Sequence, residues 1–357
     1  MKKYRISTFA IISFTVFVLS GAMLLASRLS TALADSINEH ISSPFRRFMA
    51  GFADHFSFSL FEILVLSLPL VAALIIWRAV VVFRRGYGRT RFIVNVIAVA
   101  LLLYSGNSIA LGVSYNTTSV AQHLALEETE INEQTLSVAM TNLCHEINAL
   151  SEEITYFDGE SHSGYDMSEL STLICDSYAA VASQYSYPDS FYSTAKGVDA
   201  LHFLSYLRLT GIYTYYTGEA NVNTDFPDYD VTFTTAHELS HQRGVLREDE
   251  ANFMAYLVCS ESTDPYLRYS AALSMLDYVG TALWRTNPQL YYSILDTLSE
   301  SARDDLRASY RVGAEYGDTV FADISNFVND LFLRSNGTDG VVTYGRVVRL
   351  YMSYRSK

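Results

Sequence analysis

Cysteine is scarce in this sequence, since its 357 residues contain only Cys144, Cys175 and Cys259. Three thiols are too few for a disulfide scaffold, and at least one must stay unpaired within the chain. A bridge between Cys144 and Cys175 and a set of buried free thiols are both compatible with this count. The fold therefore does not depend on a disulfide framework.

Positive charge is scarce after residue 112. Residues 1–112 carry eleven basic and four acidic side chains, whereas the remainder carries fourteen basic and thirty-four acidic ones. Binding to nucleic acid depends on neutralising phosphates, so this acidic region makes nucleic acid a poor candidate partner. The same charge suits a soluble domain that an anionic membrane surface repels.

Three apolar runs occupy the first 113 residues, at about 9–26, 60–83 and 92–113. Each is long enough to cross a bilayer as a helix. A cleaved signal peptide is the competing interpretation of the first run, because an A-x-A-like site lies at residues 31–34. Two more runs follow, so we predict an uncleaved, multi-pass membrane domain at residues 1–113.

The expected orientation in the membrane follows from basic residues in the short connections. Between the second and third runs the chain carries Arg84, Arg85, Arg89 and Arg91 and no acid. The positive-inside rule places this connection and the N-terminus in the cytoplasm. We therefore expect a multi-pass protein of the cell membrane whose residues 114–357 form an extracytoplasmic domain.

One short motif stands out in the second part of the chain, His237-Glu238-Leu239-Ser240-His241. On a helix, two histidines four residues apart lie on one face, where both can bind the same Zn²⁺ ion. Glu238 would lie beside the metal without binding it, free to act as the general base for a zinc-bound water. No histidine follows His241, so the C-terminal region supplies no further histidine ligand.

The third ligand is expected from a second helix after the turn at Gly244. Glu248 and Glu250 are the two choices, and they point about 200° apart on that helix, so only one can face the metal. Asn252 lies on the same helix face as Glu248. It could be a metal ligand itself or hydrogen-bond to the ligand and so orient it. We favour Glu248 and keep Glu250 as the alternative.

Residues 248–252, Glu-Asp-Glu-Ala-Asn, resemble the Glu-x-x-Ala-Asn ligand helix of gluzincin-type zinc peptidases. The resemblance implies that Glu248 binds zinc, although His241 and Glu248 are closer together in the sequence than is usual in gluzincins. Residues 211–259 more closely resemble an uncharacterised bacterial family of membrane proteins, a domain-of-unknown-function family that couples membrane spans to such a motif. The resemblance implies a zinc-peptidase-like site with an active-site core at about 211–260.

The segment 212–223 is rich in Tyr, Thr, Ile and Val, which favours a strand, with Gly218 as a bulge or a close backbone approach. Zinc peptidases commonly keep an edge strand before the metal helix, and a free edge can pair with an extended peptide. We therefore expect Gly218, Ala220 and Val222 to line the substrate cleft. A small structural hairpin is the competing interpretation.

Hydrolysis also needs a donor for the developing oxyanion. The sequence offers several candidates and does not choose between them: His202, Tyr213, Tyr215, Tyr216 and Tyr229.

These observations predict a mainly α fold with a small β element, in which three N-terminal transmembrane helices precede a helical, zincin-like extracytoplasmic domain. The predicted function is that of a membrane-anchored zinc metallopeptidase, a hydrolase acting on a peptide or protein substrate. The alternative is a membrane-anchored binding or signalling module whose zinc site is structural or inactive.

Overall fold

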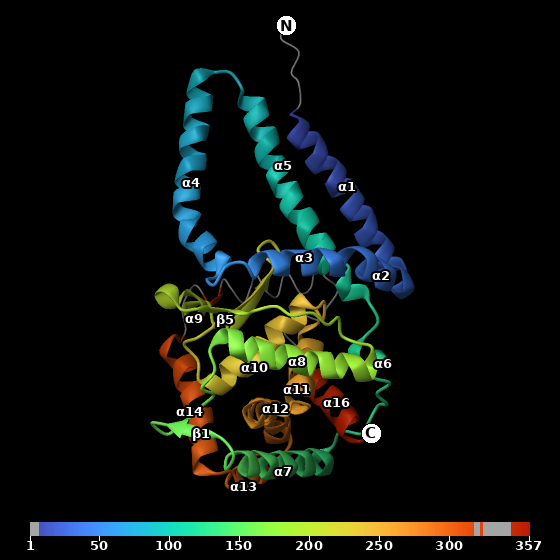
Figure 1. Cartoon of the computed structure of the whole chain (residues 1–357), viewed down its shortest axis with the longest axis vertical. Coiled ribbons are helices and arrows are strands. Elements are labelled where there is room, and N and C mark those ends of the chain that lie inside the picture. Colours follow the sequence, from blue (N-terminus) through green and yellow to red (C-terminus); the bar gives the residue numbers. More distant parts are fainter. Residues whose placement is uncertain (1–6, 318–321, 324–343) are drawn as a thin grey trace. The chain divides into compact units, whose positions relative to one another are not determined.

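A computed structural model describes residues 7–317, 322–323 and 344–357 of the chain (Figure 1). The chain forms two compact units. The first comprises Met1–Thr117 together with the short segment Thr214–Gly218, and the second comprises Thr118–Tyr213 and Glu219–Lys357. The expected division at residue 113 did not anticipate that a segment of the second part would belong to the first unit.

Three long helices dominate the first unit: α1 (Thr8–Leu29), α4 (Leu60–Arg85) and α5 (Arg89–Asn107). Each is long and apolar enough to cross a membrane, as predicted from the three apolar runs. Helix α1 packs along α5, and the rings of Phe17 and Tyr104 meet at 5.7 Å. Large apolar side chains are exposed along all three helices, which suits a surface that faces lipid.

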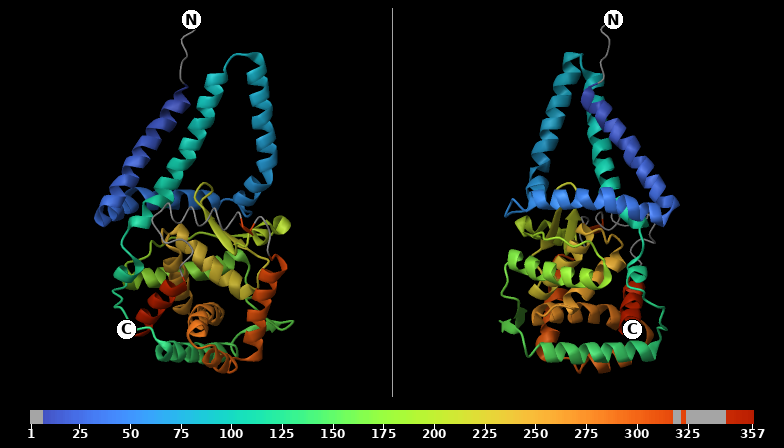
Figure 2. Two further views of the ribbon diagram at one scale, coloured as in Figure 1. Left: turned by 180° about the vertical axis from the view of Figure 1, so that it is seen from behind. Right: turned by 45° about the vertical axis from the view of Figure 1, so that its right-hand side comes forward.

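The ends of these helices are joined by shorter ones. Helix α2 (Thr31–Ile37), a π-helical turn (Asn38–Ser42) and α3 (Ser43–Ala53) connect α1 to α4, and within this unit α3 runs across the ends of the long helices (Figure 2). Arg46 on α3 is buried and donates to the carbonyl oxygen of Ala110 at 2.9 Å. Hydrogen bonds to protein oxygens make this buried charge tolerable.

The segment Thr214–Gly218 is a tight turn rather than a bulged strand. Gly218 has φ +78°, and a Cβ atom at this position would lie 2.4 Å from the backbone carbon of Met49. The positive φ and the close approach both require glycine. Tyr215 donates its hydroxyl to the carbonyl oxygen of Leu103 at 2.9 Å.

The second unit is mainly helical, as predicted, and its described β structure forms two small sheets where one small β element was expected. Its helices are α6 (Val120–His123), α7 (Glu133–Leu150), α8 (Met167–Tyr185), α9 (Phe203–Tyr206), α10 (Asp228–Gln242), α11 (Glu248–Ser260), α12 (Pro265–Thr286), α13 (Pro288–Leu295), α14 (Glu300–Glu315) and α16 (Tyr344–Arg355).

Helix α12 is the centre of the second unit, where it contacts α7, α10, α11, α13 and α16 (Figure 1). Its buried residues recur on most sides of the helix, as expected for a helix surrounded by others. The three cysteines lie buried in this core as free thiols, so the bridge between Cys144 and Cys175 is not formed.

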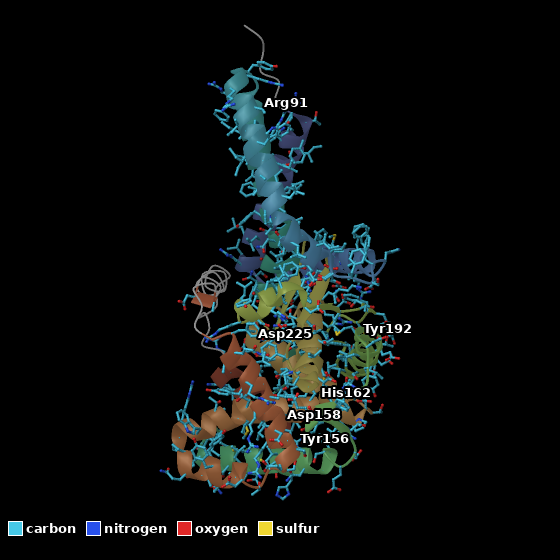
Figure 3. All side chains as sticks on the ribbon, turned by 90° about the vertical axis from the view of Figure 1, so that its left-hand side faces the viewer. Arg91, Tyr156, Asp158, His162, Tyr192 and Asp225 are labelled. Atoms are coloured by element: carbon cyan, nitrogen blue, oxygen red, sulfur yellow. The ribbon has the colours of Figure 1, made fainter. Side chains whose placement is uncertain are left out.

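A two-stranded hairpin joins α7 to α8, formed by β1 (Thr155–Phe157) and β2 (Glu160–His162). Figure 3 labels Tyr156, Asp158 and His162 on this hairpin. The ring nitrogen Nδ1 of His162 lies 2.7 Å from a carboxylate oxygen of Asp228, the first residue of α10. The hairpin therefore helps to fix the start of the helix that carries the HExxH motif.

The larger sheet has the strand order β3 (Lys196–Val198), β5 (Glu219–Asn223), β4 (Gly211–Thr214). Strand β5 is central and pairs with β3 in parallel, so the expectation that residues 218–222 form a free edge is wrong. Ala220 and Val222 are fully buried. The strand edge before the HExxH helix is β4, and the predicted lining role of Gly218, Ala220 and Val222 loses its structural basis.

Candidate metal centre

Helix α10 carries the HExxH motif. It begins after Pro227 with Asp228 and Asp230 in its first turn, where negative charge stabilises the exposed backbone N–H groups. It ends at Gln242, and Gly244 follows with φ +93°, which lets the chain reverse direction. The turn at Gly244 was predicted, and it brings the next helix back against α10.

Helix α11 begins at Glu248, one of three acids in its first turn. The stretch from Phe253 to Cys259 is buried without interruption, so α11 is fixed in the core from its second turn onward. Glu248 is therefore presented from a helix N-terminus that cannot shift without disturbing the packing below it.

His237, His241 and Glu248 converge. Their candidate ligand atoms lie within 4.8 Å of one another, and this group could hold a metal ion. The Nε2 atoms of His237 and His241 lie 3.4 Å and 3.6 Å from the two carboxylate oxygens of Glu248. Two imidazoles and one carboxylate around a common point are a donor set typical of catalytic zinc.

The orientation of His241 is fixed from behind. Its Nδ1 lies 2.8 Å from the carbonyl oxygen of Val245, so Nδ1 carries a proton and Nε2 faces Glu248, where its lone pair could bind a metal once Nε2 is deprotonated. His237 has no such support, because its buried Nδ1 lacks a hydrogen-bond partner among the described residues. The ring of His241 is thus the better-fixed ligand of the two.

Charge also marks this group as a cation site. Burial opposes ionisation of Glu248, but His241 and His237 outweigh it and hold the pKa of Glu248 well below its usual range. Burial likewise disfavours the charged form of His241, yet the Glu248 carboxylate raises the pKa of His241 to about 9. The Glu248 carboxylate between the two imidazoles is therefore a place that favours positive charge.

Glu238 lies next to the ligand set without joining it. Its side chain is buried, and burial raises the pKa of its carboxyl above the usual value. The backbone N–H of Tyr213 in strand β4 donates to this carboxylate, whereas Oε2 has no partner among the residues that the structure describes. One carboxylate oxygen is therefore held while the other is available to accept a proton.

Gly211, the first residue of β4, makes room for Glu238. A Cβ atom there would lie 2.7 Å from both Cγ and Oε1 of Glu238 and 2.7 Å from Cγ2 of Thr234. No side chain larger than hydrogen fits without a shift of β4 or α10. The role of Gly211 is not predictable from local sequence patterns, because this close approach joins residues far apart in the chain.

The alternative ligand Glu250 lies elsewhere. Both of its carboxylate oxygens lie 2.9 Å from Arg247 Nη1, and it accepts the backbone N–H of Val120. Glu250 stabilises the start of α11 instead of joining the two histidines. Asn252 lies one turn beyond Glu248, and no described hydrogen bond joins its side chain to Glu248.

A cavity of about 1100 Å³ opens from the metal-ligand group. His237, Glu248 and Asn252 line it beside the candidate ligands, and further residues of α10, α12, α13 and α14 line the rest. The side chain of Glu248 is about a third exposed, so the ligand group is accessible from this cavity. A peptide segment could therefore reach the metal ligands.

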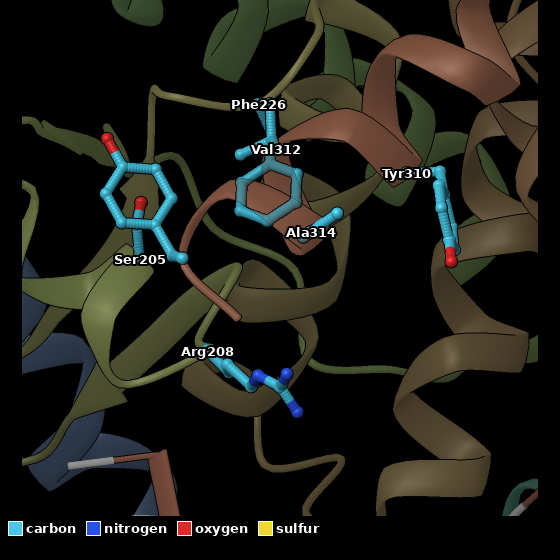
Figure 4. A pocket seen from close by; sticks show the side chains of 8 residues that line it. Ser205, Arg208, Phe226, Tyr310, Val312 and Ala314 are labelled. Carbon is cyan, nitrogen blue, oxygen red and sulfur yellow. The ribbon is translucent and has the colours of Figure 1, made fainter. Parts of the chain in front are cut away.

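A second, smaller cavity of about 420 Å³ lies between the α9 region and the end of α14 (Figure 4). It is lined by Ser205, Arg208, Phe226, Tyr310, Val312, Gly313, Ala314 and Tyr316. None of these belongs to the metal-ligand group, so we assign it no part in the chemistry.

Of the five oxyanion-donor candidates, only Tyr229 lines the large cavity. His202 is hydrogen-bonded to Asp225 at 2.7 Å, and Tyr215 donates to Leu103 within the first unit. Burial, with the nearby Asp230 carboxylate, raises the pKa of Tyr229 well above its usual value. Its hydroxyl therefore stays protonated, and it hydrogen-bonds to Asp230.

The chain matches the family described as Protein of unknown function (DUF3810) over residues 35–352, and it belongs to that family. The matched range covers parts of both units, including two of the three long apolar helices in full and the whole metal-ligand group. No curated protein and no solved structure matches the chain.

Proposed function

We propose that this protein is a membrane-anchored zinc metallopeptidase that hydrolyses peptide bonds of a peptide or protein. The observation that carries the proposal is the convergence of His237, His241 and Glu248, with Glu238 buried beside them and outside the ligand set.

The residues fit Zn²⁺ well. Two neutral imidazoles and one carboxylate suit zinc, and within the described residues the group has three members. Catalytic zinc sites commonly have three protein ligands and one open position, whereas structural sites are closed by a fourth. Bound zinc would polarise the substrate carbonyl and lower the pKa of a water molecule to about 7.

Glu238 would move the proton. Its free Oε2 accepts a proton from the attacking water while Oε1 stays held against β4. The raised pKa of its carboxyl, caused by burial, brings this group closer to the pH at which proton transfer is efficient. The same group then delivers the proton to the amine nitrogen as the C–N bond breaks.

Strand β4 would bind the substrate backbone. It is an edge strand of the larger sheet and lies beside Glu238 through Tyr213 and Gly211. An extended peptide can add to such an edge by main-chain hydrogen bonds.

The placement in the cell is part of the proposal. The three apolar helices would anchor the chain in the cell membrane, and the arginines between α4 and α5 favour a cytoplasmic side for that connection. The second unit would then act outside the cytoplasm.

The second candidate function is a membrane-anchored binding or signalling module with a structural or inactive zinc site. It would have no need for a buried carboxylate that binds neither the metal nor a cation. Glu238 is such a group, which favours the peptidase.

The test is Glu238→Gln in the full chain, purified in detergent and loaded with zinc. We expect about one zinc per chain, as in the wild type, and a loss of peptide hydrolysis on the order of 10²–10⁴-fold, because the proton acceptor is gone. The exposed Glu152→Gln variant is the matched control and should keep full activity. A hydrolytically active Glu238→Gln protein, or a wild type that binds zinc and cleaves no peptide in a proteome-derived library, would overturn the proposal.

A further inference from the structure

We propose that the far end of the large cavity binds a cationic nitrogen of the substrate, with Asp230 and Asp277 as its counter-charges. The nitrogen would belong to a Lys or Arg side chain or to the peptide's terminal amine. This inference rests on the proposed peptidase function and names the class of substrate that the site takes.

Asp230 lies on the same face of α10 as the metal ligands. It precedes His237 by seven residues, which is almost two helical turns, or about 10 Å along the axis. Phe233 and Thr234 occupy the turn between them, and all four residues line the cavity. An extended peptide rises by about 3.3–3.6 Å per residue, so one long side chain or about three residues bridge this gap.

Two buried polar atoms at this end lack partners. Asp230 Oδ2 and Ser274 Oγ, on the facing helices α10 and α12, are buried and make no hydrogen bond within the described residues. Both residues line the cavity. Buried polar atoms are nearly always paired, so Asp230 Oδ2 and Ser274 Oγ indicate a ligand that supplies hydrogen-bond donors. Arg303 Nε, also buried without a described partner on the wall of this cavity, calls for an acceptor such as a backbone carbonyl of the same ligand.

The hydrogen bonds of a nearby buried carboxylate, Asp305, can be compared with those of Asp230 and Asp277. Asp305 is fully buried, and it accepts hydrogen bonds from the Tyr269 hydroxyl at 2.6 Å and from the Ser161 backbone N–H at 2.8 Å. Asp277 lines the cavity as an exposed residue, and none of the described ion pairs or hydrogen bonds includes it. Asp305 has a partner on each carboxylate oxygen, whereas Asp230 hydrogen-bonds to Tyr229 and Ser309 and still leaves Oδ2 without a partner among the described residues.

The arginines of the cavity do not neutralise this charge. Arg303, Arg307 and Arg311 on α14 all line it, yet each is paired with an acid outside the lining. Arg303 lies 2.8 Å from Glu300, Arg307 contacts Glu300 and Asp304, and Arg311 lies 2.7 Å from Glu160. The unpaired charge that remains at this end is negative.

The wall between the acids and the metal ligands is largely apolar. Phe233, Leu273 and Leu306 contribute to it. Lys and Arg have aliphatic stems that pack along such surfaces while their charged ends reach a polar partner. This combination suits a basic side chain better than a small polar one.

The test compares matched peptides with the zinc-loaded full chain in detergent. The peptides carry one Lys or one norleucine, which has a similar stem without the ammonium, at each position around the cleaved bond. They are made with free and with acetylated N-termini. We expect kcat/KM to favour Lys at one position by at least about 10-fold, or the free terminus if the terminal amine is the bound group.

The decisive readout is the ratio of Lys to norleucine cleavage in Asp277→Asn and, independently, in Asp230→Asn. A ratio does not depend on how much protein is folded. We expect it to fall toward one in both variants and to stay unchanged in Asp158→Asn, which removes a charge from the exposed β1–β2 turn (Figure 3). A ratio near one in the wild type, or one that both cavity variants leave intact, would overturn the inference.

A binding measurement separates this inference from the proposed function. Calorimetry of the same peptides with the Glu238→Gln protein needs no turnover. Tighter binding of the Lys or free-terminus peptide, lost in Glu238→Gln/Asp277→Asn, supports the cation site even if hydrolysis is never observed. Equal binding of all peptides refutes it even if the protein is a peptidase.

Discussion

The two ends of the cavity along α10 hold carboxylates in opposite electrostatic states. At one end, Glu248 lies between two histidines, and its pKa is lowered. At the other, burial raises the pKa of Asp230 to about 6, Asp277 lies exposed on the cavity wall, and no described ion pair joins either carboxylate to a cation. The negative charge of Glu248 is compensated by the two histidines, whereas the carboxylates at the second end would be compensated only by a bound cation. A resident metal and a transient substrate group are the occupants that this difference suggests.

The largest effect is expected from a substitution that removes a metal ligand. Glu248→Ala should reduce zinc affinity by at least about 100-fold, because it removes a ligand and not merely its support. Glu250→Gln is the matched control, since it changes the neighbouring acid on the same helix turn. It should keep zinc and lower the free energy of unfolding by less than about 1 kcal/mol, because burial raises the pKa of Glu250 and offsets its pairing with Arg247. Zinc content and thermal unfolding would check both, and loss of zinc only in Glu250→Gln would reverse the ligand assignment.

The next largest effect is expected from a substitution that displaces Glu238, the proposed proton acceptor, without changing the cavity lining. Gly211→Ala should push Glu238 or β4 aside and lower kcat on the order of 100-fold, since displacements of about 1 Å have costs of this size. Zinc content and the Lys to norleucine preference should not change. The comparison variant is Gly345→Ala on α16, where the backbone does not require glycine and no atom lies within 4 Å of the added Cβ. Full activity in Gly211→Ala would mean that Glu238 has more freedom than its packing indicates.

The smallest effect is expected from removing the charge of Asp230 at the acidic end of the cavity, and it concerns stability. Because the pKa of Asp230 is about 6 in the folded chain and near its ordinary value when unfolded, the folded state loses stability as pH rises from about 4 to 6. The acids Asp277 on α12 and Asp305 on α14 add to the effect of burial, and Tyr229 and Ser309 partly offset it by hydrogen bonding.

Asn cannot ionise at position 230. Asp230→Asn should therefore gain about 2 kcal/mol over the wild type at pH 7.5 and almost nothing at pH 4. Thermal unfolding of the full chain in detergent at both pH values would measure the gap, with Asp158→Asn as the surface control. A gap that does not widen with pH would mean that Asp230 is already compensated.

Local sequence patterns predicted much of this molecule. The three apolar runs, the helix of the HExxH motif, the turn at Gly244 and the ligand helix all depend on short-range spacing, and the structure has them. Helix periodicity also predicts that only one of Glu248 and Glu250 can face the metal, since the two point in different directions, and the resemblance of residues 248–252 to the gluzincin ligand helix favours Glu248. These features need no knowledge of distant contacts.

Features that depend on long-range pairing were missed. Strand β5 was taken for an edge because its parallel partner, Lys196–Val198, is too short to recognise in the sequence. Gly211 and Asp277 acquire their roles only when β4 and α12 pack against α10. Asp230 is different, because its spacing of seven from His237 was visible and could have been used.

Because Asp230 and His237 lie on the same helix, α10 fixes the distance between the two ends of the proposed substrate site. Asp230 and His237 are separated by nearly two whole turns of one rigid, buried segment, so their distance and direction cannot vary independently. One residue inserted between them would swing Asp230 about 100° around the axis and out of the cavity. If both ends bind the same substrate, the helical geometry of α10 fixes the distance between the basic group of the substrate and the peptide bond that is cleaved.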